Sequence, residues 1–185
     1  MNQWKNLGTA GGHVEIVPYS AEWTRLFELE AQRIRAACGD LLPAIEHIGS
    51  TAIPGMPAKP IIDIMPGVKT HADGLRTIEP LQQLGYDYHG ENGIPGRFYF
   101  VLRYEQRSVL HVHIFEIGAE NWERHLLFRD TLRAHPEVAA EYAALKQILA
   151  LRFHEDRQAY TEAKGAFINQ VVQQARRLRE RDTTT

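Results

Sequence analysis

The chain has 185 residues, of which 44% are hydrophobic and 24% charged, and its formal net charge is -2. This length suits one globular domain with its own core, and the charge balance argues against a dedicated nucleic-acid-binding protein. The single cysteine, Cys38, excludes an intramolecular disulfide and a cysteine-based zinc site, and we expect a buried, inert thiol. No segment has the apolar length of a membrane span or a signal peptide, so we expect a cytoplasmic protein without membrane contact.

The first half of the chain predicts helices and short strands in alternation. Apolar spacing and turn residues indicate an edge strand over 13–17, a helix from an N-cap at Ser20 to about Gly39, strands over 45–48 and 61–65, and a helix over 72–84. Pro80 is expected to break or bend the last helix. Residues 1–13 are polar and contain glycine, so we expect a flexible N-terminal segment.

Two longer strands follow, over 97–104 and 109–117, and the polar residues 105–108 between them have the length of a hairpin connection. Successive side chains of a strand point to opposite faces. The second strand therefore has two faces, one with Leu110, Val112 and Ile114 and the other with His111, His113 and Phe115.

Helical patterns dominate the rest of the chain. One helix is expected from about Asn121, and a second from Pro136, because proline suits the first turn of a helix. A third carries an apolar stripe from Tyr160 to Leu178, and the polar residues 180–185 are expected to form a flexible tail. The order of elements predicts a single α+β domain over residues 14–172, in which helices flank a small mixed β-sheet and a helical cluster follows it.

One segment combines several features of an anion-binding site. The strand over 45–48 runs into Gly49-Ser50-Thr51, and Asp63 follows in the next apolar strand after twelve intervening residues. Gly49 lets the backbone approach an anion closely, and Ser50 and Thr51 offer hydroxyl and N–H donors. Burying an unpaired carboxylate is costly, so Asp63 requires a metal, a cation or several donors. The alternative is a structural carboxylate capped by backbone donors.

This segment resembles the nucleotidyltransferase signature, in which a Gly-Ser pair precedes acidic residues on the next strand. Longer stretches together resemble the GrpB family: IEHIGSTAIPGMPAKPIIDI, GIPGRFYF, HVHIFE, WERHLLFRDTLRAHPEVAAEYAALK and YTEAKGAFI. The resemblance covers about residues 14–172 and implies a nucleotidyltransferase-like fold. It also implies that Asp63 is the catalytic residue and that Gly49, Ser50 and Thr51 bind the triphosphate of a nucleotide.

The second acid of that signature is absent, because Ile61 and Met65 occupy the positions two residues before and after Asp63. His111 and His113 stand where a later acid is expected. One carboxylate and two imidazoles suit a divalent transition metal better than magnesium, so Asp63, His111 and His113 are the candidate metal ligands. The alternative is that the two histidines are only packed or exposed.

Lys59 and Arg97 are the candidate phosphate-binding cations, because each lies next to a strand that borders the same edge of the sheet. The alternative for both Lys59 and Arg97 is an ordinary solvated cation, which the sequence supports equally well. Other positions stay undecided: which of Glu46 and His47 faces the pocket, whether His125 and Arg129 line a cleft or a solvated helix face, and whether Tyr160, which shares its stripe with Lys164, is more than a core residue.

We expect a protein that binds a nucleotide or another phosphorylated small molecule, with a divalent metal ion as cofactor. If it is an enzyme, the reaction is metal-dependent nucleotidyl transfer. The missing second acid supports an alternative, a non-catalytic GrpB-type binding or protein-folding accessory module that retains the fold. A third hypothesis is a metal-dependent hydrolase built on the histidine pair.

Overall fold

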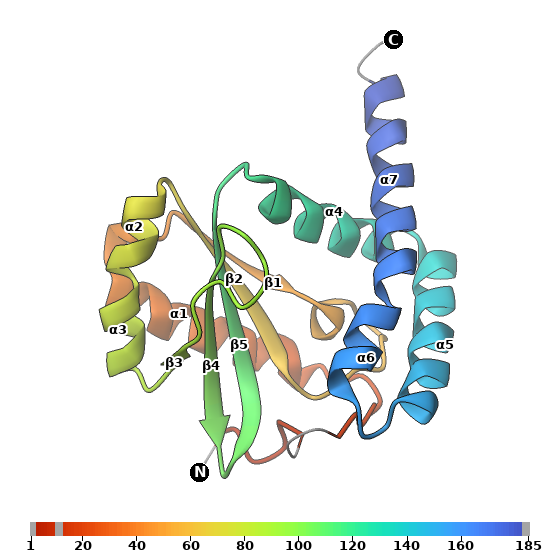
Figure 1. The fold of residues 1–185 in the computed structure, drawn as a ribbon, viewed down its shortest axis with the longest axis horizontal. Helices are drawn as coiled ribbons and strands as arrows, with labels where there is room; N and C mark the ends of the chain where they lie inside the picture. The colour runs from red at the N-terminus through yellow and green to blue at the C-terminus, as the bar shows by residue number, and fades with distance from the viewer. Residues whose placement is uncertain (1–2, 10–12, 183–185) are drawn as a thin grey trace.

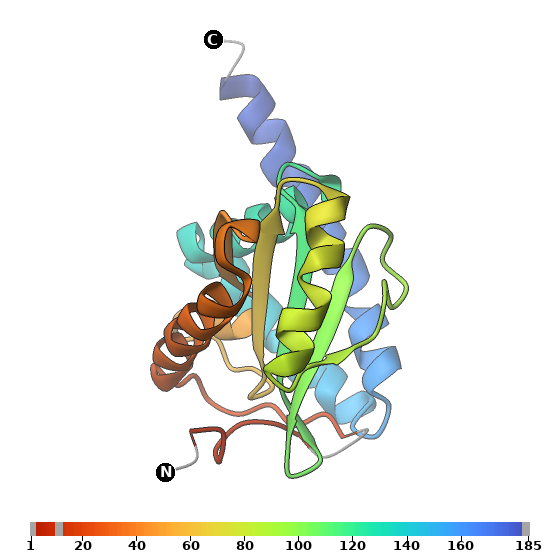
Figure 2. The same ribbon diagram turned by 90° about the vertical axis from the view of Figure 1, so that its left-hand side faces the viewer.

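The computed structural model describes residues 3–9 and 13–182 (Figures 1 and 2). Its helices are α1 (Glu22–Cys38), α2 (His71–Arg76), α3 (Ile78–Gln83), α4 (Glu120–Ala134), α5 (Pro136–Arg152), α6 (Arg157–Ala163) and α7 (Gly165–Asp182), with short 3-10 segments η1 (Gly39–Leu41) and η2 (Ser50–Ala52). Its strands are β1 (Ala44–Ile48), β2 (Ile62–Val68), β3 (Asp87–Tyr88), β4 (Phe98–Tyr104) and β5 (Arg107–Glu116).

The five strands form one mixed sheet in the order β1-β2-β5-β4-β3. β2 and β5 are parallel, and the other neighbours are antiparallel. The α+β fold with a small mixed sheet flanked by helices is therefore confirmed. No helix of the described residues is both long and apolar enough to cross a lipid bilayer.

Helices cover both faces of the sheet. Helices α1 to α3 lie on one side and α4 to α7 on the other (Figure 1). The first face buries the main core, to which β2 contributes Ile62 and Ile64 and β5 contributes Leu110, Val112 and Ile114. The alternation predicted for β5 is thus confirmed, and it leaves His111 and His113 on the face that the C-terminal helices cover.

Several element boundaries differ from the predictions for local reasons. The segment 13–17 is not a strand, since only Val17 pairs there, in an isolated bridge with Ala58. The helix over 72–84 divides at Thr77, whose hydroxyl donates to the Gly74 carbonyl, and not at Pro80. Pro80 lies in the first turn of α3, where a backbone N–H has no intrahelical partner, so proline is tolerated.

The remaining differences concern helix and hairpin ends. The N-cap of α1 is Ala21, one residue after Ser20, whose hydroxyl accepts from the Glu22 N–H at 3.3 Å. The hairpin turn consists of Glu105 and Gln106, which both have positive φ. β5 therefore begins at Arg107, two residues before the predicted start of that strand. The expected third C-terminal helix is two helices, α6 and α7, and α7 continues to Asp182, within the expected tail. Pro136 begins α5 as predicted, and the short strand β3 was not predicted.

Part of the expected flexible N-terminal segment packs against the core. Trp4 and Leu7 belong to the main core cluster, and Leu7 is 1% exposed. The Gly8 N–H donates to the Pro60 carbonyl at 2.6 Å, and Thr9 bridges Ser108 on β5. Residues 10–12 and 183–185 lie outside the described residues.

We predict that Leu7→Ala lowers the free energy of unfolding by about 2–5 kcal/mol, because it leaves a cavity in the main core. Lys5→Ala is the control, since Lys5 is exposed in the same segment. Urea denaturation of both variants measures the difference. Equal, small effects would show that residues 3–9 contribute nothing to packing.

Candidate functional site

Asp63 lies in the middle of the sheet face that α4 to α7 cover. Parallel pairing of β2 with β5 places Asp63 opposite His111, and His113 follows on the same face. Asp63 Oδ1 lies 3.2 Å from His111 Nδ1 and 3.4 Å from His113 Nε2. The predicted meeting of Asp63, His111 and His113 is therefore confirmed, and one ligand atom from each lies within 4.8 Å of the others.

An arginine faces the second ring nitrogen of each histidine. Arg97 Nη1 lies 3.2 Å from His113 Nδ1, and Arg157 Nη2 from α6 lies 3.1 Å from His111 Nε2. Arg97 also donates to the carbonyls of Asn92 at 2.8 Å and Glu91 at 3.1 Å. The predicted cation Arg97 thus lies at the site, and Arg157 was missed.

Ionisation in this cluster follows from burial and hydrogen bonds together. Burial opposes the charge of Asp63, but hydrogen bonds from His111 and His113 outweigh it and keep the carboxyl pKa well below its ordinary value. Burial lowers the pKa of both histidines despite the neighbouring carboxylate. The cluster therefore holds one carboxylate between two neutral imidazoles at neutral pH.

Two lysines complete the cationic side of the site. The ammonium of Lys59 lies 5.3 Å from the centroid of the Tyr160 ring, and that of Lys164 lies 4.3 Å from it. Burial, with repulsion from Arg157 as a smaller cause, lowers the pKa of Lys59 to about 7 and that of Lys164 to about 8. Tyr160 is 1% exposed and therefore lies in the core, where its ring is close to both ammonium groups.

Gly49 approaches Asp63 so closely that a side chain has no room there. Its φ is +70°, and a Cβ built on it would overlap Asp63 Oδ2. Ser50 follows, with its hydroxyl beside the phenol of Tyr142 from α5. The Thr51 hydroxyl is buried and lies 3.0 Å from His47 Nε2, so it does not face Asp63.

The pairing of β1 with β2 decides between Glu46 and His47. Glu46 is opposite Met65 and shares the face of Asp63, whereas the His47 ring stacks on Phe27 of α1 at 4.6 Å, on the other face. The Glu46 carboxylate accepts from Arg129 Nη1 at 2.6 Å. Glu46 is therefore on the site's face but is already paired.

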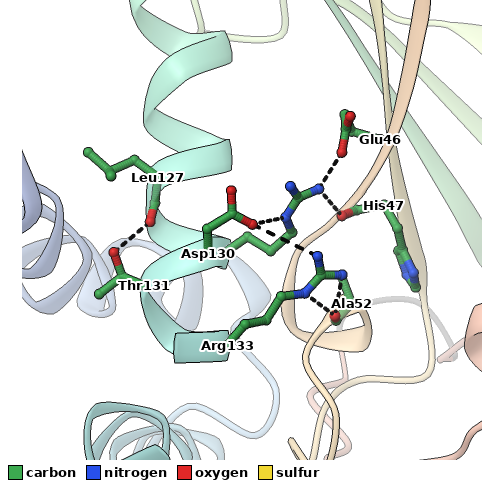
Figure 3. A network of polar contacts seen from close by, with 8 residues as sticks. Glu46, His47, Ala52, Leu127, Asp130, Thr131 and Arg133 are labelled. Atoms are coloured by element: carbon green, nitrogen blue, oxygen red, sulfur yellow. Dashed lines mark hydrogen bonds and ion pairs between the residues drawn. The ribbon is translucent and has the colours of Figure 1, made fainter. Parts of the chain in front are cut away.

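Two arginines of α4 hold the turn that carries Gly49 and Ser50. Arg129 is buried and donates to the His47 carbonyl at 3.0 Å, so it is a structural residue and not part of a solvated face. Arg133 donates twice to the Ala52 carbonyl, at 3.0 and 2.8 Å (Figure 3). These contacts fix the turn against α4. His125 lies nearer the site, with its ring 6.3 Å from that of His113.

Arg157, which the sequence analysis missed, belongs to a recognisable spacing. Arg157, Tyr160 and Lys164 are separated by three and four residues, which places them on one helical face. The apolar stripe of the sequence analysis starts at Tyr160, so it includes Lys164 but leaves out Arg157, which lies one turn earlier. A separate groove of about 1060 Å³ between residues 14–19 and α5 contains none of the charged residues around Asp63.

The family model described as GrpB protein matches residues 13–174. The chain belongs to the GrpB family. It is 35% identical over 170 residues to the glutamate-rich protein GrpB of Alkalihalophilus pseudofirmus, covering 90% of this chain and 98% of that protein. It is 42% identical to YqkA of Bacillus subtilis over 90% of this chain, but it spans only 48% of that relative's length.

Solved structures agree with this assignment. The crystal structure of GrpB from Enterococcus faecalis matches with a TM-score of 0.80 and 33% identity, over 87% of this chain and 96% of that one. The Cid1 poly(U) polymerase matches with a TM-score of 0.51 at 13% identity, over 74% of this chain and 45% of that one. The chain therefore has a nucleotidyltransferase-like fold within the GrpB family.

We predict that Gly49→Ala destabilises the protein more than Gly55→Ala does. Both glycines have positive φ, so alanine is strained by about 1–3 kcal/mol at either position, but only at Gly49 does the new Cβ meet Asp63. Overpacking of this kind adds about 1–3 kcal/mol. Chemical denaturation of the two variants isolates the clash, and equal losses would contradict the close approach.

We predict that the ligand-free protein becomes more stable as the pH rises from about 7 to about 9. Burial lowers the pKa of Lys59 and Lys146 to about 7 and of Lys164 to about 8. The unfolded chain keeps its lysines protonated to about pH 10 and so binds more protons than the folded chain in this window. Burial raises the pKa of the Cys38 thiol to about 11, which lowers the stability as the pH rises. This is one group, whereas three lysines increase the stability.

The measurement is the free energy of unfolding in urea at several pH values. Lys59→Met should flatten the rise, whereas Lys5→Met at the exposed surface should leave it unchanged. A stability that falls steadily over this range would contradict the three lowered lysine pKa values.

Proposed function

We propose that this protein binds a nucleotide or another phosphorylated small molecule at the Asp63 centre. The observation that carries the proposal is the gathering of Lys59, Arg97, Arg157 and Lys164 around one carboxylate. Two guanidinium groups and two lysine amines surround one acid; although burial lowers the pKa of both lysines, the two arginines alone leave an excess of positive charge in a partly dehydrated place. Phosphate groups neutralise such an excess, and arginine binds them through two parallel hydrogen bonds.

The Gly49–Ser50 turn supports the same proposal. The Gly49 backbone contacts Asp63 closely, and Arg133 holds the turn by donating to the Ala52 carbonyl. A turn held in this way can present Ser50 to a ligand without moving when the ligand arrives. A preorganised site loses less conformational entropy on binding.

Nucleotidyl transfer is a second candidate, which the fold shared with the Cid1 poly(U) polymerase favours. The matched Cid1 structure is the MgGTP-bound form. The present chain carries one carboxylate on β2, since Ile61 and Met65 flank Asp63 at two residues' distance. The single carboxylate therefore favours ligand binding over nucleotidyl transfer, and the experiments below distinguish the two.

We predict that the wild-type protein binds at least one nucleoside triphosphate or inorganic pyrophosphate. Isothermal titration calorimetry with each of these ligands measures the affinity. Arg157→Gln should weaken binding about tenfold or more, because a hydrogen bond between charged groups contributes about 1.5–3 kcal/mol. Arg25→Gln is the control, since Arg25 is exposed on α1 against the opposite face of the sheet. A wild-type protein that binds none of these ligands would overturn the proposal.

The same preparations separate an enzyme from a binding module. Pyrophosphate release is measured with each nucleoside triphosphate, in the presence and in the absence of added divalent metal. Release that Asp63→Asn abolishes would establish transfer if the nucleotidyl group is recovered on an acceptor, whereas recovery as free nucleoside monophosphate would establish hydrolysis. Saturable binding without release would establish a non-catalytic module, which is the alternative that the single acid favours.

A further inference from the structure

Each histidine of the Asp63 centre has one nitrogen that faces the carboxylate and one that faces an arginine. His111 directs Nδ1 to Asp63 at 3.2 Å and Nε2 to Arg157 at 3.1 Å. His113 directs Nε2 to Asp63 at 3.4 Å and Nδ1 to Arg97 at 3.2 Å. The two rings thus have the same pattern of neighbours although they use opposite nitrogens.

Hydrogen-bonding chemistry assigns the proton on each ring. A guanidinium offers only donors, so the nitrogen that faces an arginine must be the bare acceptor. A neutral imidazole carries one N–H, which therefore lies on the nitrogen that faces Asp63. His111 and His113 then both donate to Asp63 Oδ1 while accepting from Arg157 and Arg97, and every group in the chain of contacts has a partner.

A metal ion requires the opposite arrangement. The coordinating nitrogen must be bare, and the other ring N–H is normally donated to a carboxylate, a carbonyl or water. With metal beside Asp63, the outward N–H groups of His111 and His113 would face the N–H groups of Arg157 and Arg97 at about 3 Å. The donor set suits a metal in kind, but its surroundings do not fit one.

Arg97 is held firmly in the position that causes this conflict. Two backbone carbonyls, those of Glu91 and Asn92, accept from it, and its guanidinium carbon lies 4.5 Å from the centroid of the Tyr99 ring. The same Tyr99 ring contacts both imidazoles, with centroid distances of 5.6 Å to His111 and 5.1 Å to His113. Rotation of Arg97 away from His113 would break these contacts together.

We infer that Arg97 and Arg157 exclude divalent metal from the Asp63–His111–His113 centre by holding both histidines in the tautomers that donate to Asp63. The centre then meets an anionic ligand with protein cations alone. Its metal-excluding character rests only on the contacts of these five residues. The statement about the ligand rests on the proposed function and is tested separately.

Metal titration without any nucleotide tests the inference. Zinc, cobalt and manganese are titrated into the full chain, purified without a histidine tag. The wild-type protein should show no stoichiometric binding in the micromolar range. The double variant Arg97→Gln/Arg157→Gln should bind one zinc or cobalt ion, because a glutamine carbonyl accepts from the outward N–H of each ring. Adding Asp63→Asn should remove that binding, and Arg25→Gln should behave as wild type.

A spectroscopic measurement keeps the inference testable if the double variant does not fold. Long-range ¹H–¹⁵N correlation spectra of the wild-type protein should show His111 protonated at Nδ1 and His113 at Nε2. Opposite tautomers would overturn the inference. So would stoichiometric metal binding by the wild type that His111→Gln abolishes, or a folded double variant that gains no metal. Failure of phosphate binding would overturn only the proposed function.

Discussion

An ionised carboxylate on an apolar strand is the constraint on which the rest of the site depends. Asp63 lies among Ile62, Ile64 and Met65, and its charge survives there only because donors surround it. His111 and His113 supply N–H groups across the parallel pair of strands, and arginines behind them complete their hydrogen bonding. The glycine at position 49 follows from the same constraint, since any side chain there would displace the carboxylate.

The cations around Asp63 exceed what the carboxylate alone requires. Burial disfavours the protonated form of Lys59 and Lys164, and each also lies in the repulsive field of Arg157. A sequence selected for stability alone would place apolar side chains at such positions, because an uncompensated buried charge costs about 3–5 kcal/mol. Strain of this kind is typical of sites whose electrostatics are completed by a ligand.

The sequence predicts the parts of the site that depend on local geometry. The period of two along a strand placed His111 and His113 on one face, and the Gly-Ser turn before Asp63 was recognisable from residue type. Residue type assigns Thr51 to the ligand through its hydroxyl and N–H donors, but it does not give the direction of the side chain, whose hydroxyl lies 3.0 Å from His47 Nε2. Contacts between distant segments could not be predicted from local sequence patterns. Arg157 contacts His111 only because α6 packs near the sheet. Residues 3–9 are ordered by the packing of Trp4 and Leu7 against the main core.

The two halves of the chain meet at this site, and electrostatics links them. The sheet supplies the carboxylate and its histidines, whereas α6 and the residue after it supply Arg157 and Lys164. In the absence of an anion, Lys59, Arg157 and Lys164 repel one another across the boundary between sheet and helices. An anion bound among them removes that repulsion and adds attraction to both sides. On the proposed function, ligand binding and the docking of α6 would stabilise each other, because anything that binds only the folded arrangement increases its population by mass action.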